Sequence, residues 1–293
     1  MTDHPDPATA AFLAHRNLLF TVAYEMLGSA VDAEDVLQET WLQWTGVDFD
    51  TVREVRPFLV RITTRQALTR LRTLGRRRES YVGPWLPEPL LTAPDVAEDV
   101  ELADSVSMAM LLVLETLTPT ERAVFVLREV FDLSYDEIAA AVDKSALAVR
   151  QIAHRARSHV AARRPRAVAS PTQTRDALAA FQRAVETGDL QALLNVLSPD
   201  VVLLTDGGGI VRAALIPIIG ATPVATLLAR LPATGGTIRP AHVNGHPALI
   251  VDRDGELDTV LALRADASRI TGLYAVRNPH KLSRLDHETT LLR

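Results

Sequence analysis

The chain has 293 residues, of which 47% are hydrophobic, and a formal net charge of −5, which together predict a globular protein of two or three modest domains. The absence of cysteine excludes disulfides, thiol catalysis and thiolate zinc sites, and the eight histidines are scattered, so we expect no metal and no cofactor. The chain also lacks a secretory signal and an apolar run of about 20 residues, so we expect a cytoplasmic protein without membrane attachment.

Charge is strongly segregated along the chain, and the first basic block covers residues 61–78, with seven arginines and no carboxylate. At about 100° per residue, one helical sector collects Arg61, Arg65, Arg72 and Arg76. The opposite sector is apolar and holds Leu59, Val60, Ala67, Leu71 and Leu74, whereas Ile62 and Leu68 fall nearer the arginines. The pattern predicts a helix that is buried on one side and binds phosphates or unpaired bases with the other. A solvated cationic face is the alternative.

The stretch "YVGPWLPEPL", residues 81–90, follows the arginine helix and is too apolar for a free linker. We expect Trp85, with Leu86 and Pro87 beside it, to anchor this linker against a folded neighbour. A local hydrophobic staple under the preceding helices is the alternative. An acidic segment, residues 95–104, comes next and offers a folded partner a further surface to hold.

Residues 118–160 have the signals of a helix-turn-helix. Thr118 to Glu121 and Ser134 to Glu137 each form a capping box, and a turn at 142–145 precedes the second helix of the pair. That helix has an apolar stripe of Val149, Ile152, Ala153, Ala156 and Val160. We expect the other side of this helix to enter the major groove of DNA. Base edges would be contacted by Ala148, Arg150, Gln151 and His154, and phosphates by Arg155 and Arg157.

The composition changes after residue 166, where a domain boundary is expected. Helical patterns run from about residue 174 to 198 with a break at Gly188-Asp189, and short apolar runs follow. Two strands are expected on either side of Asp206 to Gly209, and hairpins at Asn244-Gly245 and Asp254-Gly255. Helices followed by a meander of strands predict an α+β domain with a curved antiparallel sheet.

The segment "DAEDVLQETWLQW", residues 32–44, together with the arginine helix and the helix-turn-helix, resembles regions 2 and 4 of bacterial extracytoplasmic-function sigma factors. The resemblance implies two all-α domains, region 2 at 8–80 and region 4 at 108–165, joined by a linker at 81–107. It implies that core RNA polymerase and promoter DNA are the partners. Contacts to the clamp helices of the largest polymerase subunit would come from Asp35, Gln38, Glu39 and Trp41, although Trp41 in the core is the alternative. Region 4 would contact the polymerase flap and the minus 35 element, and the arginines of region 2 the minus 10 element.

Three further motifs resemble those of the sigma subgroup that carries a SnoaL-like (NTF2-like) cone at the C-terminus, here residues 172–290. They are "WLPEP" at 85–89, "DGGG" at 206–209 and "NPHKL" at 278–282, with Ile210 in place of the usual lysine and His280 in place of a common aspartate. The resemblance implies that this domain regulates the sigma regions in cis. The interdomain residues would be Trp85, Leu86, Pro87, Asp206, Gly207, Gly208, Gly209, Asn278, Pro279, Lys281 and Leu282.

Two functions other than that of a sigma factor are compatible with parts of the sequence. A SnoaL-like cone fused to a DNA-binding module could hold a small ligand, or be a vestigial enzyme that uses Asp206, His242, His246 and Asp258. A simple repressor would need only the helix-turn-helix, and the segment at 32–44 argues against it. We therefore expect a transcription initiation factor that is not an enzyme.

Overall fold

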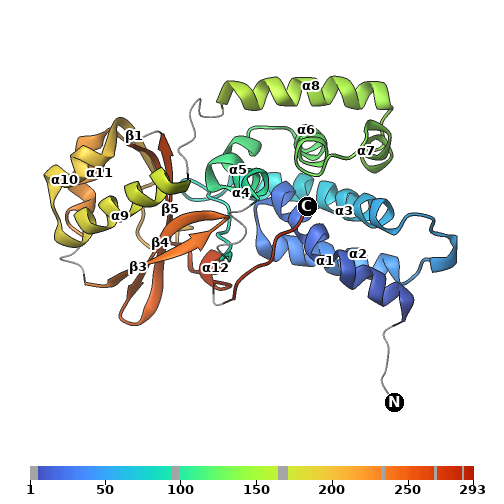
Figure 1. Cartoon of the computed structure of the whole chain (residues 1–293), viewed down its shortest axis with the longest axis horizontal. Coiled ribbons are helices and arrows are strands. Elements are labelled where there is room, and N and C mark those ends of the chain that lie inside the picture. The colour runs from blue at the N-terminus through green and yellow to red at the C-terminus, as the bar shows by residue number, and fades with distance from the viewer. Residues whose placement is uncertain (1–5, 94–98, 164–170, 232–234, 267–268, 286) are drawn as a thin grey trace, which may run out of the picture. The chain divides into compact units, whose positions relative to one another are not determined.

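The computed structural model describes residues 6–93, 99–163, 171–231, 235–266, 269–285 and 287–293 (Figure 1). The chain divides into two compact units. The first, the helical unit, contains Met1–Glu79, Val113–Arg163 and Thr290–Arg293. The second, the α+β unit, contains Ser80–Leu112 and Arg164–Thr289. The segment between the two sigma-like regions therefore groups with the C-terminal part of the chain.

The first part of the helical unit is a bundle of α1 (Pro7–Leu27), α2 (Ala30–Trp44) and α3 (Val55–Glu79), with the short 3-10 helix η1 (Phe49–Thr51) between α2 and α3. The Ser29 side chain caps α2 by accepting a hydrogen bond from the Asp32 backbone N–H. Trp44, the last residue of α2, is fully buried, and its indole N–H donates to the carbonyl of Ala8 in the first turn of α1.

The second part contains α6 (Pro119–Phe125), the π-helical turn η3 (Val126–Val130), α7 (Tyr135–Val142) and α8 (Ala146–Arg163). Both predicted capping boxes are confirmed, because Thr118 and Ser134 exchange side-chain and backbone hydrogen bonds with the glutamate three residues later. Asp143 ends α7 in the left-handed conformation and turns the chain into α8. Figure 1 shows α8 alongside α6 and α7, which confirms the predicted helix-turn-helix.

The α+β unit begins with the linker, which carries α4 (Val100–Val106) and most of α5 (Met108–Leu114). It continues with α9 (Pro171–Thr187) and α10 (Leu190–Val196), which confirm the predicted break at Gly188-Asp189. The remaining helices are α11 (Ala221–Leu228) and α12 (Pro279–Leu282). The strands are β1 (Leu197–Asp206), β2 (Ile218–Ile219), β3 (Thr237–Val243), β4 (His246–Arg253), β5 (Glu256–Asp266) and β6 (Arg269–Val276).

These strands form one sheet in the order β2-β1-β6-β5-β4-β3, and the α+β class expected from the sequence is confirmed. The sheet is mixed rather than wholly antiparallel, because β1 pairs in parallel with β6. The chain between these two strands contains α11 and the strands β2 to β5, and it brings β6 alongside β1 in the same direction. The prediction of a strand directly after Gly209 was also wrong. The next strand is β2, which begins just after Pro217 and pairs with β1 through only two residues. Both predicted hairpin turns are present, with positive φ at Asn244, Gly245, Asp254 and Gly255.

Two apolar layers cover the two faces of this sheet. One face packs against α9, α10 and α11 through Phe181, Leu193 and their neighbours. The opposite face packs against the linker and α12 through Leu86, Met108 and Leu282. The linker thus supplies part of the core of the α+β unit. Among the described residues, no helix has both the length and the apolar character needed to cross a membrane.

Candidate functional site

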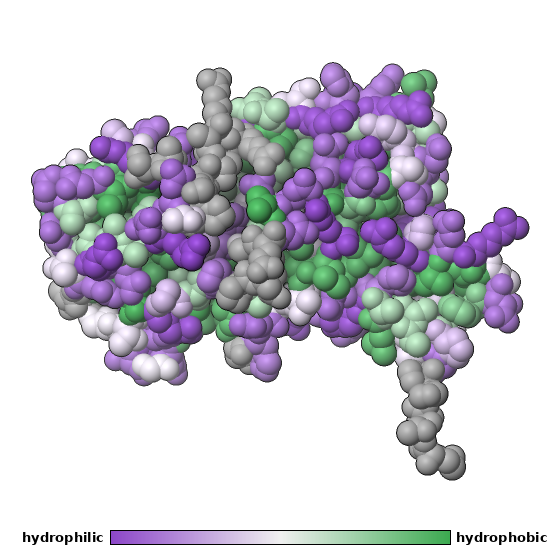
Figure 2. All heavy atoms as spheres, in the orientation of Figure 1, coloured by the Kyte–Doolittle hydropathy of each residue, from purple (hydrophilic) through white to green (hydrophobic). Residues whose placement is uncertain are grey.

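The exposed side of α8 carries the predicted base and phosphate contacts. Val149, Ile152, Ala153, Ala156 and Val160 are all buried, as the stripe predicted. Ala148 is half-buried, and the exposed side chains of the other face are those of Arg150, Gln151, His154, Arg155 and Arg157. The region of Figure 2 that corresponds to α8 in Figure 1 is mainly hydrophilic. This helix can therefore pack inward through one side and present cations and amides through the other.

Neighbouring groups hold two of the α8 arginines. The guanidinium of Arg150 lies 5.4 Å from the ring centre of Tyr135, on whose ring Arg128 also lies at 5.1 Å. Arg157 forms an ion pair of 3.7 Å with Glu129. Arg157 must release this pair to bind a phosphate fully. The hydrogen bond from Thr118 lowers the pKa of the Glu121 carboxyl most, and the charge of the exposed Arg155 lowers that pKa as well.

The arginines of α3 do not form one free surface. Arg61 lies over the Phe58 ring at 4.8 Å, and Arg65 donates to the carbonyl of Ala140 in α7 at 2.9 Å. Arg72 is exposed, and the side chain of Arg76 lies outside the described part of the chain. Ile62 and Leu68 are buried although the helical wheel placed them near the arginines, because α3 packs against α7 as well as against α1 and α2.

The α2 surface holds the residues that the resemblance assigns to the polymerase. Asp35 forms an ion pair of 2.6 Å with Arg70, which also bonds Asp32 at 2.7 Å. Gln38 and Glu39 are exposed. Trp41 is half-buried with its ring 5.0 Å from that of Phe12, and the core position belongs to Trp44 instead. The sequence analysis did not single out Arg70, whose only signal was its place within the arginine block.

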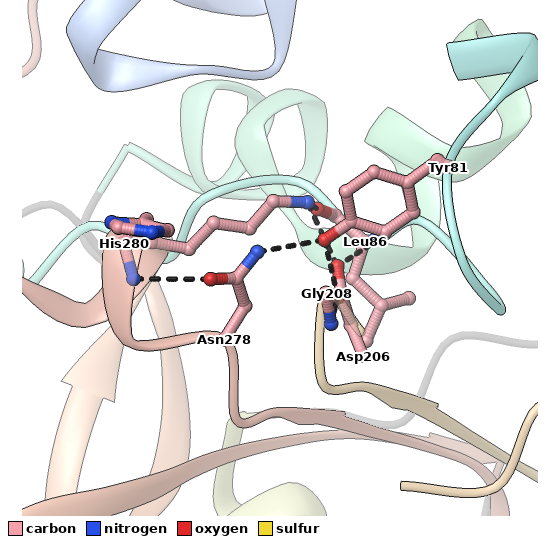
Figure 3. A network of polar contacts seen from close by, with 7 residues as sticks. Tyr81, Leu86, Asp206, Gly208, Asn278 and His280 are labelled. Atoms are coloured by element: carbon pink, nitrogen blue, oxygen red, sulfur yellow. Dashed lines mark hydrogen bonds and ion pairs between the residues drawn. The ribbon is translucent and has the colours of Figure 1, made fainter. Parts of the chain in front are cut away.

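The three loop motifs of the α+β unit meet at one polar network, which we call the linker site (Figure 3). Its centre is the fully buried carboxylate of Asp206. Four donors reach this carboxylate: the Tyr81 hydroxyl at 2.6 Å, the Leu86 N–H at 2.9 Å, the Gly208 N–H at 3.0 Å and Lys281 Nζ at 2.8 Å. Buried charge is tolerated here because its oxygens are satisfied and a cation is paired with it.

Lys281, in α12, makes several contacts in the linker site besides its ion pair with Asp206. Its ammonium group also donates to the carbonyl of Leu86 and lies 4.2 Å from the ring centre of Trp85 and 4.9 Å from that of Tyr81. Trp85 itself is only half-buried, and Leu86 is the residue that the sheet encloses. The linker is thus held by an apolar anchor at Leu86 and by a cation that two aromatic rings cover.

Asn278 connects its own motif to Tyr81, at the start of the linker. Its amide donates to the Tyr81 hydroxyl at 2.8 Å, and its side-chain oxygen accepts the backbone N–H of His280 at 3.0 Å, which caps α12. Gly208 has φ of +63°, and a Cβ there would lie 2.3 Å from the Asn278 amide nitrogen, so only glycine fits. Gly207 and Pro87 are buried, Gly209 and Pro279 are exposed, and Leu282 belongs to the core.

Tyr81, which bonds two of the three motifs, was not expected from the sequence. Burial and the bond to Asp206 raise the pKa of its hydroxyl, so Tyr81 stays a neutral donor. Its signal was a tyrosine, an aromatic side chain with a polar tip, at the start of the apolar stretch 81–90. His280 takes part through its backbone, and the side chain of Ile210 is exposed, so the network keeps its polar contacts despite those two departures.

Three of the four groups named for an enzymatic site, Asp206, Asp258 and His246, have separate partners. Asp206 belongs to the linker site, and Asp258 pairs with Arg277 at 2.8 Å and Arg253 at 3.5 Å. His246 bonds the carbonyl of Ala103 at 3.0 Å. These contacts tie each group to the framework of the unit.

Comparison with known proteins places these surfaces in a family. Residues 11–77 match the model of Sigma-70 region 2, and residues 107–160 match that of Sigma-70, region 4. The chain is 35% identical over 294 residues to the probable ECF RNA polymerase sigma factor SigI of Mycobacterium tuberculosis, covering 98% of this chain and 99% of that protein. It is 31% identical over 288 residues to the ECF RNA polymerase sigma factor SigJ of the same organism, covering 93% and 92%.

A solved structure is similar over almost the same length. The crystal structure of Mycobacterium tuberculosis extracytoplasmic function sigma factor SigJ aligns with a TM-score of 0.76 and 28% identity, covering 95% of this chain and 99% of that one. Both sequence and structure therefore match through the helical regions and the C-terminal unit alike. The chain belongs to the extracytoplasmic-function family of RNA polymerase sigma factors.

Proposed function

We infer that this chain binds core RNA polymerase in the cytoplasm and directs it to promoters. The observation that carries this function is the exposed cationic and amide face of α8, which is held on a helix-turn-helix by a fully buried stripe. In this assignment Gln151 and His154 contact base edges of the minus 35 element, and Arg155 binds phosphate. Region 2 contacts the minus 10 element through Arg61, Arg65, Arg72 and Arg76.

The polymerase contacts follow the surface of α2. Gln38 and Glu39 are exposed and available to the clamp helices of the largest subunit, while Arg70 orients Asp35 beside them. Trp41 contributes its half-buried ring to the same surface, and region 4 contacts the flap. The domain boundaries proposed from the sequence, 8–80 for region 2 and 108–165 for region 4, enclose these surfaces.

The closed packing of the helical unit supports weak DNA binding by the free protein. The carbonyl of Ala140 in α7 holds Arg65, and the buried Arg122 of α6 donates to the carbonyl of Glu25 in α1 at 2.9 Å. Region 2 and region 4 must separate before both basic surfaces can reach one promoter. We propose that core polymerase stabilises the separated arrangement by binding each region at its own site.

The α+β unit acts in cis by holding the linker between the two regions. Leu86 fills its sheet face, and the backbone N–H and carbonyl of the same residue are bonded by Asp206 and Lys281. Because the unit and the linker share one chain, the effective concentration is near millimolar, and a modest contact stays formed. With Asp206 engaged by the linker, we assign the unit a binding role rather than a catalytic one.

Run-off transcription with reconstituted core polymerase and a promoter library tests this function. The wild-type chain should give polymerase-dependent initiation on a defined subset of templates. Trp85→Ala and truncation before Asn278 should change the yield of transcript while co-purification with core polymerase is kept. Arg239→Met, which alters an exposed ion pair of the same unit, is the control. Absence of template-dependent initiation would refute the sigma function, and wild-type yields from both linker-site variants would refute regulation in cis.

A further inference from the structure

The turn Asn244-Gly245, between β3 and β4, binds the linker at a second place outside the three loop motifs. Asn244 is only 1% exposed, and its backbone N–H donates to the carbonyl of Leu90 at 2.9 Å. Its side-chain oxygen accepts the Leu90 N–H at 3.0 Å, and its side-chain nitrogen donates to the carbonyl of Val106 at 2.9 Å. One amide thus joins two linker segments that are separated along the chain.

Contacts of the neighbouring residues extend this attachment. The Gly245 N–H donates to the Thr92 hydroxyl at 3.0 Å, and the Thr92 N–H donates to the carbonyl of His242 at 3.0 Å. Leu91 forms an isolated antiparallel bridge with Val243, so the linker adds to the free edge of β3. A Cβ on Gly245 would lie 2.8 Å from the Cα of Ala103, which leaves room for glycine alone.

The next hairpin turn shows that these contacts are not needed to make a turn. Asp254 and Gly255 have φ of +54° and +82°, close to the +55° of Asn244 and +72° of Gly245. An added Cβ at Gly255 would meet nothing within 4 Å. An aspartate therefore suffices for the backbone, and the asparagine at 244 is distinguished by using both its acceptor and its donor on the linker.

We propose that the Asn244-Gly245 turn is a linker clamp that sets the promoter spacer length accepted by the holoenzyme. This inference rests on the proposed sigma function. The linker site holds residues 81–86, just after region 2, and the clamp holds Leu90, Thr92, Ala103 and Val106, just before region 4. Each extended residue that is released from the clamp lengthens the linker by about 3.4 Å, which is close to the rise of one base pair. Release of the linker end next to region 4 therefore alters the distance between the minus 10 and minus 35 elements that regions 2 and 4 can reach together. Asn244 and Gly245 are positioning residues, because they act through the linker.

The test compares Gly245→Ala with Gly255→Ala in the full-length chain. Both substitutions put alanine at positive φ and carry the same backbone strain, but only the first one pushes against Ala103. Run-off transcription is measured on one promoter whose spacer is native, or one base pair longer or shorter. Gly245→Ala should change the ratio of native to altered spacers by about threefold or more, as expected for the loss of a hydrogen-bonded contact, and Gly255→Ala should keep the wild-type ratio.

A second pair of variants covers the case in which Gly245→Ala does not fold. Asn244→Asp keeps the acceptor for Leu90 but places a carboxylate oxygen against the Val106 carbonyl, whereas Asp254→Asn makes the reverse exchange in the other turn. Asn244→Asp should alter spacer preference and Asp254→Asn should not. If Gly245→Ala or Asn244→Asp folds and the wild-type spacer ratio persists, the clamp is overturned while the sigma function stands. If the wild type gives no polymerase-dependent transcript on any template, both fail.

Discussion

The buried pair of Asp206 and Lys281 decides how firmly the linker is held. The carboxylate is fully buried and the lysine side chain is 8% exposed, so each charge is compensated mainly by the other and by the hydrogen bonds around it. Arg239 and Asp252 form an ion pair of similar length, 2.9 Å, at the surface of the same unit. Burial makes the two pairs energetically unlike, because water can replace a partner only at the surface.

Lys281→Met should lower the unfolding free energy of the α+β unit by about 3 kcal/mol, because it leaves Asp206 without its cation. Arg239→Met should lower it by less than about 1 kcal/mol. Urea titrations followed by hydrogen exchange in β1 and β6 measure both values within the unit concerned. Equal losses in the two variants would mean that Asp206 does not depend on Lys281.

His246 makes the stability of the same unit depend on pH. Burial lowers the pKa of His246 below 6.5 in the folded chain, and the charge of His242 lowers it further. The hydrogen bond to the Ala103 carbonyl and the charge of Asp104 act in the opposite direction but do not outweigh burial. The unfolded chain then binds the proton more readily, so the unfolding free energy falls as the pH drops below about 6.5, until folded His246 is protonated as well.

His246→Gln should therefore lose less stability than the wild type between about pH 7 and pH 5, since glutamine keeps a donor for the Ala103 carbonyl but does not titrate in this range. Urea denaturation at the two pH values gives the difference. His154→Gln, at an exposed position on α8 in the other unit, is the control for the substitution itself. Identical pH profiles for His246→Gln and the wild type would contradict the assignment.

At the residue scale, the sequence located the motifs but not all of the contacts. Asp206, Asn278 and Lys281 were singled out, and they meet at the linker site. Tyr81 was missed. Trp85 was expected to be the anchor, but Leu86 is the buried residue, because its side chain packs against the sheet. Such partners lie more than a hundred residues away along the chain, beyond the reach of local patterns.

At the scale of elements, local signals predicted the helices of region 4 well. The capping boxes at Thr118 and Ser134 use side chains three residues apart, so the sequence contains all of their partners. The parallel pairing of β1 with β6 has no such local signal, because it depends on how the chain between them packs. The burial of Ile62 and Leu68 was hidden for the same reason, since it follows from the packing of α7 on α3.

The packing of α6 on α1 depends on Arg122, which is 2% exposed. Its guanidinium donates to the Glu25 carbonyl and to the carboxylate of Glu115, and burial lowers its pKa to about 9. Arg122→Met should lower the unfolding free energy of the helical unit by about 3 kcal/mol, because it removes the buried cation that pairs with the half-buried Glu115 carboxylate and donates to the Glu25 carbonyl.

Arg128→Met is the matched control for that experiment. Arg128 is partly exposed, where it pairs with Asp132, donates to the Leu133 carbonyl and lies over the Tyr135 ring, so its loss should cost about 1 kcal/mol, less than the loss of Arg122. Urea denaturation followed by circular dichroism at a helical wavelength compares the two variants. A midpoint for Arg122→Met equal to that of Arg128→Met would show that the buried guanidinium does not hold α6 to α1.

At the scale of the whole molecule, sequence and contacts divide the chain differently. The family resemblance implied region 2, a linker and region 4, and the change of composition after residue 166 predicted a separate C-terminal domain. By contacts, Ser80–Leu112 belongs to the α+β unit, and the last four residues, Thr290–Arg293, belong to the helical unit, where the Leu292 N–H donates to the Thr21 hydroxyl. The α+β unit is therefore built partly from the linker, and removing only the C-terminal part of this unit would expose Leu86 and Met108.

We propose that this chain guides polymerase to promoters by base recognition through α8. Run-off transcription from a promoter library tests this proposal, with one holoenzyme carrying Gln151→Ala and another carrying Arg155→Ala. Gln151→Ala should change which minus 35 sequences are used, whereas Arg155→Ala should lower initiation evenly and reduce the salt slope of promoter binding by about one. Equal losses on every template in both variants would contradict base recognition by α8.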